Sequence, residues 1–356
     1  MQRDFSPLPP LSRLEEQYPS SPSFRNVVKR HRERATRLLN GGEERRLVLF
    51  VGPCSIHDEK LALEYALRLR SLRKRVDSRI FIVMRAFLEK PRTLSGWKGY
   101  LYDPDLDGTY DVEKGIIRSR LLLSRLTELG IPLATEFLDP FLAGYYAEFV
   151  TWGVIGARTS SSQVHRGLAS SLPMPVGFKN DTNGATVPAI CGALAARNRQ
   201  TVIGSDREGR VGMIDASGNQ ATHLILRGSE RDSNYDPLSV TEAVKTSLHY
   251  GLRTPLVIDC SHGNSGRRPD RQKGVFRACL RRITSGESRI CGMMLESHLH
   301  PGNDSSITDP CIGWEETEEL VSEAFDLLRP HRSRDQPKKR PSTLSTPSLP
   351  QRETIS

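Results

Sequence analysis

The sequence predicts an α/β fold: a barrel of eight parallel strands, a (β/α)8 TIM barrel, with an N-terminal extension and an inserted β-hairpin. Nine short runs rich in apolar and β-branched residues occur along the chain, and segments with a helical pattern separate several of them. The runs are apolar throughout, which is typical of parallel strands buried on both faces. A length of 356 residues is ordinary for one such barrel. A doubly wound sheet is the alternative fold.

The chain before the first strand is predicted in two parts. Residues 1–25 contain five prolines and are expected to form an extended N-terminal arm. Arg25 to Asn40 have the pattern of a charged helix, which Gly41 and Gly42 end. We expect the barrel domain to occupy residues 26–329.

The nine apolar runs supply one strand more than a barrel needs. Residues 201–203 face residues 210–214 across a short polar turn that leaves no room for a helix, so residues 200–216 are interpreted as an inserted β-hairpin. Helical patterns occur at Leu61–Leu72, Arg118–Leu129, Ala185–Ala196 and Val240–Leu248. The nine runs are Leu47–Val51, Phe81–Met84, Leu133–Phe137, Val154–Ala157, Val176–Phe178, Thr201–Ile203, His223–Leu226, Leu256–Ile258 and Ile290–Leu295.

Composition excludes several classes of protein. No apolar run approaches the roughly 20 residues of a membrane span, so no membrane partner is expected. The six cysteines are scattered and include no C-x-x-C pair, which indicates reduced thiols and a cytoplasmic location. Residues 330–356 carry six basic and two acidic residues among Pro, Ser and Thr and are predicted to be a disordered basic tail. No nucleic-acid motif accompanies the net charge of +9, so no nucleic-acid partner is expected.

Candidate functional residues follow the predicted strands. The active sites of such barrels lie at the carboxyl ends of the strands, so the residues at those ends are the first candidates. Each of the eight is ionisable or a possible metal ligand, which is hard to explain by chance. They are Cys54, Arg85, Glu136, Arg158, Lys179, Arg227, His262 and Glu296.

The cations among the candidates indicate an anionic substrate. Lys90, Arg92 and Thr93 flank Pro91 in a loop after the second strand, and a solvated basic loop is the alternative interpretation. Guanidinium groups bind phosphate and carboxylate at two points, and lysine adds a mobile charge. The whole set could hold two phosphates and a carboxylate; it comprises Arg85, Lys90, Arg92, Arg158, Lys179 and Arg227.

The remaining candidates offer mixed metal ligands. Cys54, His262 and Glu296 provide sulfur, nitrogen and oxygen, and Asp309 after the last strand could complete the set. Such ligation suits a divalent metal such as Mn, Fe, Co or Zn. Taken singly, Cys54 could be an inert buried thiol and His262 a loop hydrogen-bonding group. Asp309 could instead begin the helix predicted over Cys311–Leu328.

The motifs around these residues resemble class I 3-deoxy-7-phosphoheptulonate (DAHP) synthase, in the same order, from about Leu11 to Leu328. The resemblance is carried by residues 51–58 (VGPCSIHD), 89–93 (EKPRT), 96–99 (GWKG), 156–159 (GART), 162–166 (SQVHR), 175–180 (PVGFKN), 223–228 (HLILRG), 259–265 (DCSHGNS), 296–298 (ESH), 307–309 (ITD) and 311–315 (CIGWE).

This resemblance implies a TIM barrel that condenses phosphoenolpyruvate with erythrose 4-phosphate in the first step of the shikimate pathway, which leads to aromatic amino acids. It implies that Cys54, His262, Glu296 and Asp309 bind the metal. Arg85, Arg158, Lys179 and Arg227 would hold phosphoenolpyruvate, Lys90 would face the aldehyde, and Arg92 and Thr93 would bind the erythrose phosphate. Glu136 could activate water and Lys179 could shuttle a proton. A homodimer or homotetramer and an aromatic amino acid effector are also implied.

Two of the departures from the family pattern concern the hairpin and the metal site. The hairpin tip is Ser205–Arg210, where the family usually has Thr-Lys-x-Gly-His, and the loop between Glu296 and Asp309 is shorter than usual. The first departure puts inhibition and assembly in question, and the second makes Asp309 the weakest of the expected ligands. The alternatives are a synthase acting on another aldose phosphate, as in the octulosonate family, and a non-catalytic regulatory homologue. The residues 90–93 argue against the first, and the intact ligand set argues against the second.

Overall fold

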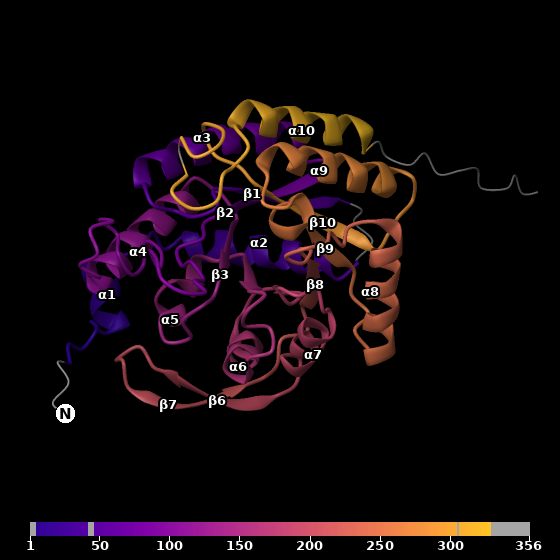
Figure 1. Cartoon of the computed structure of the whole chain (residues 1–356). Helices are drawn as coiled ribbons and strands as arrows, with labels where there is room; N and C mark the ends of the chain where they lie inside the picture. The colour runs from indigo at the N-terminus through magenta and orange to yellow at the C-terminus, as the bar shows by residue number, and fades with distance from the viewer. Residues whose placement is uncertain (1–4, 42–45, 305, 329–356) are drawn as a thin grey trace, which may run out of the picture.

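A closed barrel of eight parallel strands forms the centre of the computed structural model, which describes residues 5–41, 46–304 and 306–328 (Figure 1). The predicted TIM barrel is therefore confirmed, and the predicted tail lies outside the described residues. Around the barrel the strand order is β1-β10-β9-β8-β5-β4-β3-β2. The bounds are β1 Leu47–Gly52, β2 Ile80–Arg85, β3 Leu133–Glu136, β4 Trp152–Ile155, β5 Val176–Lys179, β8 Thr222–Leu226, β9 Leu256–Asp259 and β10 Ile290–Glu296.

The strands are buried on both faces, as their continuous apolar runs predicted. Pairing of β1 with both β2 and β10 closes the barrel. Inside it, the rings of Phe50 and Trp152 stack with centroids 3.7 Å apart. Helix α2 (Phe24–Leu39) contributes Ala35, Leu38 and Leu39 to the same interior cluster, so it covers the amino-terminal end of the barrel. The carboxyl-terminal end is left for the functional loops.

The remaining helices surround the barrel, and local sequence signals set several of their ends. The Asp58 side chain accepts a hydrogen bond from Leu61 N at the start of α3. Asp236 caps α8, which begins with Pro237 and ends at Gly251 in a left-handed conformation with φ 94°. The bounds are α3 Glu59–Val76, α4 Val112–Glu128, α5 Ala143–Tyr146, η1 Ala147–Phe149, α6 Gln163–Ser171, α7 Val187–Ala195, α8 Pro237–Tyr250, η2 His262–Ser265, α9 Pro269–Thr284 and α10 Trp314–Leu327.

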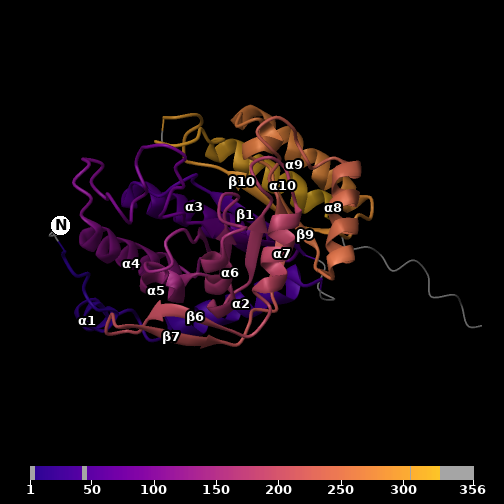
Figure 2. The same cartoon turned by 60° about the horizontal axis from the view of Figure 1, so that its bottom comes forward.

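The inserted hairpin is present at the predicted place. Strands β6 (Gln200–Ser205) and β7 (Val211–Ala216) pair only with each other, in antiparallel register, and lie outside the barrel against α6 (Figure 2). Their outer surface exposes Ile203, Val211 and Met213. None of the helices in the described part of the chain has the length and apolar character that crossing a bilayer requires.

The extended conformation predicted for residues 1–25 is wrong for part of that segment. Residues Leu11–Gln17 form helix α1, which begins directly after Pro10. The prolines flank this helix rather than interrupt it, and burial of Leu14 in the core stabilises it. Helix α1 also contacts the tip of the hairpin, because Ser12 N donates to Arg207 O and Arg207 pairs with Glu15. The amino-terminal segment and the insertion therefore support each other.

Candidate active site

The structure brings the candidate residues together at the carboxyl-terminal end of the barrel. Arg85, Glu136, Lys179 and Glu296 are the last residues of β2, β3, β5 and β10. The others lie in the loops that follow strands at the same end: they are Cys54, Lys90, Arg92, Thr93, Arg158, Arg227, His262 and Asp309. The strand-end rule thus predicted one connected region from residues far apart in the chain.

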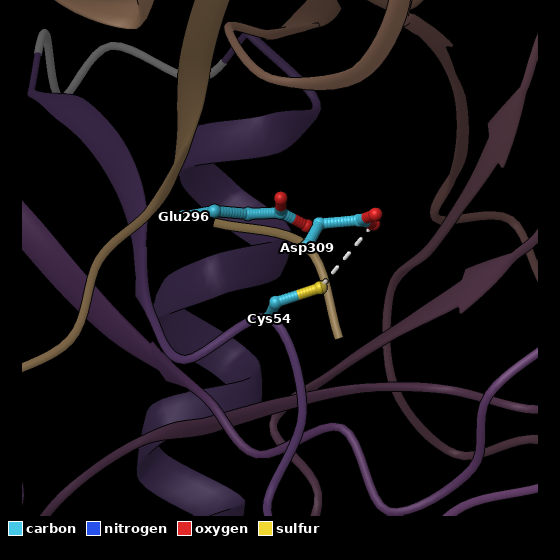
Figure 3. Close-up of side chains that lie close together, drawn as sticks. All are labelled: Cys54, Glu296 and Asp309. Carbon is cyan, nitrogen blue, oxygen red and sulfur yellow. Dashed lines mark hydrogen bonds between the residues drawn. The ribbon is translucent and has the colours of Figure 1, made fainter. Parts of the chain in front are cut away.

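Three of the predicted metal ligands converge closely. The Sγ atom of Cys54 and carboxylate oxygens of Glu296 and Asp309 all lie within 4.8 Å of one another, and Figure 3 shows the three side chains close together. The Cys54 thiol lies 3.5 Å from Asp309 Oδ2. The fourth predicted ligand, His262, has its Nε2 atom 3.8 Å from Glu296 Oε1. One sulfur, one nitrogen and two carboxylates therefore border the same small space.

Asp309 reaches this space in spite of the shortened loop before it. Gly302 and Cys311 form a two-residue antiparallel bridge that folds the loop back on itself. The Ser306 hydroxyl donates to the Asp309 carbonyl at 2.7 Å, and Thr308 Oγ1 lies 2.9 Å from Ser55 Oγ in the loop that carries Cys54. These contacts place the carboxylate without the longer loop that the family usually has.

Asp259 is the main site residue that sequence reasoning passed over. Its fully buried carboxylate lies 2.9 Å from His262 Nδ1 and 3.1 Å from Lys179 Nζ. Burial would raise its pKa, but His262 and Lys179 outweigh that effect and hold the pKa well below its usual range. The sequence feature that could have identified Asp259 is its position as the last residue of β9, three residues before the candidate ligand His262. The hydrogen bond of His262 Nδ1 is to Ser261 Oγ at 3.0 Å, and the Ser261 hydroxyl also lies against Asp259 Oδ1, so Ser261 and Asp259 together border the ring. The backbone of His262 has an uncommon φ of 52°.

The Arg85 side chain is paired with a carboxylate of the acidic group, which consists of Cys54, Glu296 and Asp309. Its side chain is fully buried, and Nη2 donates to Glu296 Oε1 at 3.0 Å while Nε donates to the Pro53 carbonyl at 3.2 Å. The guanidinium lies over the Phe87 ring, 4.0 Å from its centroid. A buried carboxylate needs such a partner because an isolated charge is costly to desolvate.

Lys90 adds a positive charge on the other side of the cysteine. Its Nζ atom lies 3.0 Å from Cys54 Sγ and donates to the Cys54 carbonyl at 3.1 Å. Burial and the neighbouring Glu296 raise the pKa of the Cys54 thiol, whereas Lys90 opposes them. Burial also raises the pKa of Asp309 in principle, but Lys90 and His262 outweigh it and lower that pKa. The local field thus keeps Asp309 ionised and favours the thiol until a cation binds.

Several cations lie at the same end of the barrel as this acidic group. Arg227 is only 4% exposed, and its Nη1 atom is buried without a hydrogen-bond partner among the described residues. The Nε atom of Arg158 donates to Thr93 Oγ1 at 3.1 Å, which links two loops across the mouth of the barrel. Arg92 is more exposed and donates to the Trp97 carbonyl at 2.7 Å. A buried guanidinium nitrogen without a partner is suited to an anionic ligand.

Glu136 lies in a space that a glycine provides. The Glu136 side chain is 6% exposed, and a Cβ atom added to Gly156 would lie 2.2 Å from its Oε1 atom. Only glycine at position 156 leaves this carboxylate where it is. The predicted cations, carboxylate and metal ligands therefore lie together at the carboxyl-terminal end of the barrel.

Comparisons with known proteins identify the family to which the chain belongs. Residues 28–326 match the model of the DAHP synthetase I family. The chain is 43% identical over 320 residues to the Trp-sensitive phospho-2-dehydro-3-deoxyheptonate aldolase of Enterobacter agglomerans, covering 87% of this chain and 91% of that relative. It is 44% identical over 299 residues to the Tyr-sensitive enzyme of Escherichia coli K12, covering 81% and 84%. The solved phospho-2-dehydro-3-deoxyheptonate aldolase of Francisella tularensis superposes with a TM-score of 0.88 at 37% identity, covering 93% of this chain and all of that one.

The chain belongs to the DAHP synthetase I family. Its activity is that of a 3-deoxy-7-phosphoheptulonate synthase, a transferase of aromatic amino acid biosynthesis that joins phosphoenolpyruvate to erythrose 4-phosphate and releases phosphate. Enzymes of this family are generally metal-dependent, and the donor group of Cys54, Glu296 and Asp309 is consistent with that property.

Proposed function

We propose that the residues gathered at the barrel mouth form one metal-dependent active site for DAHP synthesis. The observation that carries this proposal is the convergence of Cys54, Glu296 and Asp309, with His262 next to Glu296, beside several cations. Cys54, His262, Glu296 and Asp309 would bind the ion, with Ser261 and Asp259 bordering the histidine ring. Mixed sulfur, nitrogen and oxygen donors suit Mn, Fe, Co or Zn. When bound, the ion supplies Lewis-acid polarisation of the aldehyde oxygen.

Phosphoenolpyruvate would bind among these cations. Arg158, Lys179 and Arg227 would neutralise its anionic groups, and the unpartnered Nη1 atom of Arg227 provides a donor for one of them. Arg85 is more deeply buried and would contact the substrate while keeping its pair with Glu296. Fixing the anion at several points orients the enol carbon, which is a weak nucleophile and gains most from correct placement.

Erythrose 4-phosphate would lie across the loop after β2. Lys90, held beside the Cys54 sulfur, would donate to the aldehyde oxygen and stabilise the negative charge that develops there during carbon–carbon bond formation. Arg92 and Thr93 would bind the distal phosphate. Because Thr93 Oγ1 accepts from Arg158 Nε, the two substrate subsites share a contact.

Two side chains are suited to the proton transfers that follow. Bond formation leaves positive charge on the enol-ether carbon, and water adds to that carbon. The buried carboxylate of Glu136 would orient this water or accept its proton. Lys179 would hold or move a proton at Nζ, which lies 3.1 Å from Asp259 Oδ2. Water exclusion by the surrounding loops would protect the intermediate.

Regulation and assembly are further parts of this proposal. The relatives named Trp-sensitive and Tyr-sensitive suggest an aromatic amino acid effector for this chain as well. The exposed apolar residues of the hairpin, Ile203, Val211 and Met213, suggest a homodimer or homotetramer that would cover them. Inhibition assays with the three aromatic amino acids, and light scattering of the purified protein, would test these two points separately.

Phosphate release is the experiment that tests the main proposal. The protein is assayed with phosphoenolpyruvate and erythrose 4-phosphate after chelation, and again after Mn²⁺ is restored. We expect release that requires the aldose, disappears with the chelator and returns with the ion. Phosphate release with a different aldose phosphate, but not with erythrose 4-phosphate, would show that the enzyme uses another substrate. A folded protein that releases no phosphate with any of the four metals would support the non-catalytic alternative.

A further inference from the structure

Two consecutive arginines in the loop between β9 and α9 have different surroundings. Arg268 forms an ion pair with Asp270, with nitrogen–oxygen distances of 3.2 and 2.8 Å. The Arg267 side chain has neither a hydrogen bond nor an ion pair with any residue that the structure describes. An arginine normally finds partners for its five donors when an acidic neighbour is within reach. Arg267 therefore presents an unengaged guanidinium, and Arg268 does not.

Backbone geometry holds Arg267 at the active site. Its N–H donates to the His262 carbonyl at 2.7 Å, and its φ of 60° lies in the left-handed region that side chains other than glycine rarely adopt. Gly266 has the same φ, and His262 has a φ of 52°. A loop that keeps two non-glycine residues in this conformation is fixed by its surroundings. Arg267 lines one small hollow with His262, Glu296 and Asp309.

The positive charge of Arg267 acts on the Arg227 guanidinium. It lowers the pKa of Arg227, after burial and more strongly than Arg158 does. Three guanidinium groups thus act on the region around the buried, unpartnered Nη1 atom of Arg227. Like charges repel, so such a cluster is stabilised when an anion binds between them.

We propose that Arg267 is an additional substrate-binding residue that, together with Arg158 and Arg227, binds the phosphate group of phosphoenolpyruvate. The inference rests on the proposed function of this site. Burial decides between the two anionic groups of the substrate. Arg85 is fully buried at the base of the site and suits the carboxylate, which stays in the product. Arg267 is exposed at the rim and suits the phosphate, which must leave toward solvent.

The test compares Arg267→Ala and Arg267→Lys with Arg268→Ala in the full-length, metal-loaded enzyme. We expect Arg267→Ala to raise both the KM for phosphoenolpyruvate and the inhibition constant of inorganic phosphate about tenfold, the effect of one charge-assisted hydrogen bond. Arg267→Lys should recover part of that loss. The KM for erythrose 4-phosphate should stay within about twofold in every variant, and Arg268→Ala should resemble the wild type in all three constants.

Two kinetic results would overturn the inference. One is an Arg267→Ala enzyme whose constants for phosphoenolpyruvate and phosphate match those of the wild type. The other is a rise confined to the KM for erythrose 4-phosphate, which would assign Arg267 to the other substrate. Thermal unfolding of each variant shows whether the loop has kept its fold, and no change is expected because position 267 is exposed and remains non-glycine.

Failure of the proposed function would look different. In that case the wild type itself would release no phosphate. Calorimetric titration of the metal-loaded proteins with inorganic phosphate then still tests Arg267, because it needs no turnover. Weaker binding to Arg267→Ala than to Arg268→Ala would support the anion subsite, and equal binding would refute it.

Discussion

Substitution of Gly156 by alanine tests the role of Glu136 through its position rather than its chemistry. The added Cβ would lie 2.2 Å from Glu136 Oε1 and 3.1 Å from its Cδ, whereas ordinary contact begins near 3.4 Å. The carboxylate must therefore move by about 1 Å. A displacement of that size can reduce a rate by roughly 10²-fold when the group acts directly on the reacting atoms. Because the clash falls on the end of a side chain, the expected loss of stability is only about 1–2 kcal/mol.

Steady-state phosphate release gives kcat and both KM values for this variant. We expect kcat to fall by about 10²-fold with small changes in KM. Gly144→Ala in α5 is the matched control, because a Cβ there meets no atom within 4 Å. Adding Gly156→Ala to Glu136→Gln should reduce kcat little further, since both changes remove the same group. Full activity of Gly156→Ala, with the protein folded, would show that the placement of Glu136 does not limit turnover.

Three other predictions concern the metal, the buried ion pair and pH. Cys54→Ala should lose metal content and activity together, measured by elemental analysis and phosphate release; full metal content would show that the ligand is misassigned. In chelated protein, Arg85→Met should lower the free energy of unfolding by about 3–5 kcal/mol, because Glu296 keeps an unpaired buried charge; a urea titration with no change would contradict this. Burial lowers the pKa of His31 from 6.5 to about 4, so the unfolded chain binds more protons between these pH values. The free energy of unfolding should therefore fall by about 2.5 kcal/mol from pH 6.5 to 4. His31→Gln should flatten that slope, and an unchanged slope would place the cause elsewhere.

Much of the architecture follows from the pattern of apolar residues. The continuous apolar runs predicted the eight barrel strands, and the polar turn near residues 206–209 predicted the hairpin, because both features depend on local chemistry. Helix α1 was missed since its stability comes from Leu14, from the core around it and from the hairpin tip, far away in the sequence. Prolines on either side of a short helix resemble an extended arm until tertiary contacts are known.

The site shows the same division between local and distant information. Its residue types were predictable because the carboxyl ends of barrel strands meet in space, so each strand end contributed a candidate. Their partners were not predictable. The pairing of Arg85 with Glu296 joins residues 211 positions apart, and Asp259 serves both Lys179 and His262. A sequence shows which charges are available, but only the closed barrel decides which of them neutralise each other and which remain for a ligand.

The loop that carries Lys90 illustrates why this matters for function. Its neighbour Glu89 is almost fully buried and forms no ion pair with a described residue. It accepts hydrogen bonds from Tyr146 and from the N–H groups of Leu138 and Asp139. Burial raises the pKa of Glu89 to about 7. These contacts fasten the loop after β2 to the loop after β3, so the position of the Lys90 ammonium depends on a carboxylate that is bound to the neighbouring loop. The chemistry of the site therefore rests on polar contacts beneath it as much as on the residues that line it.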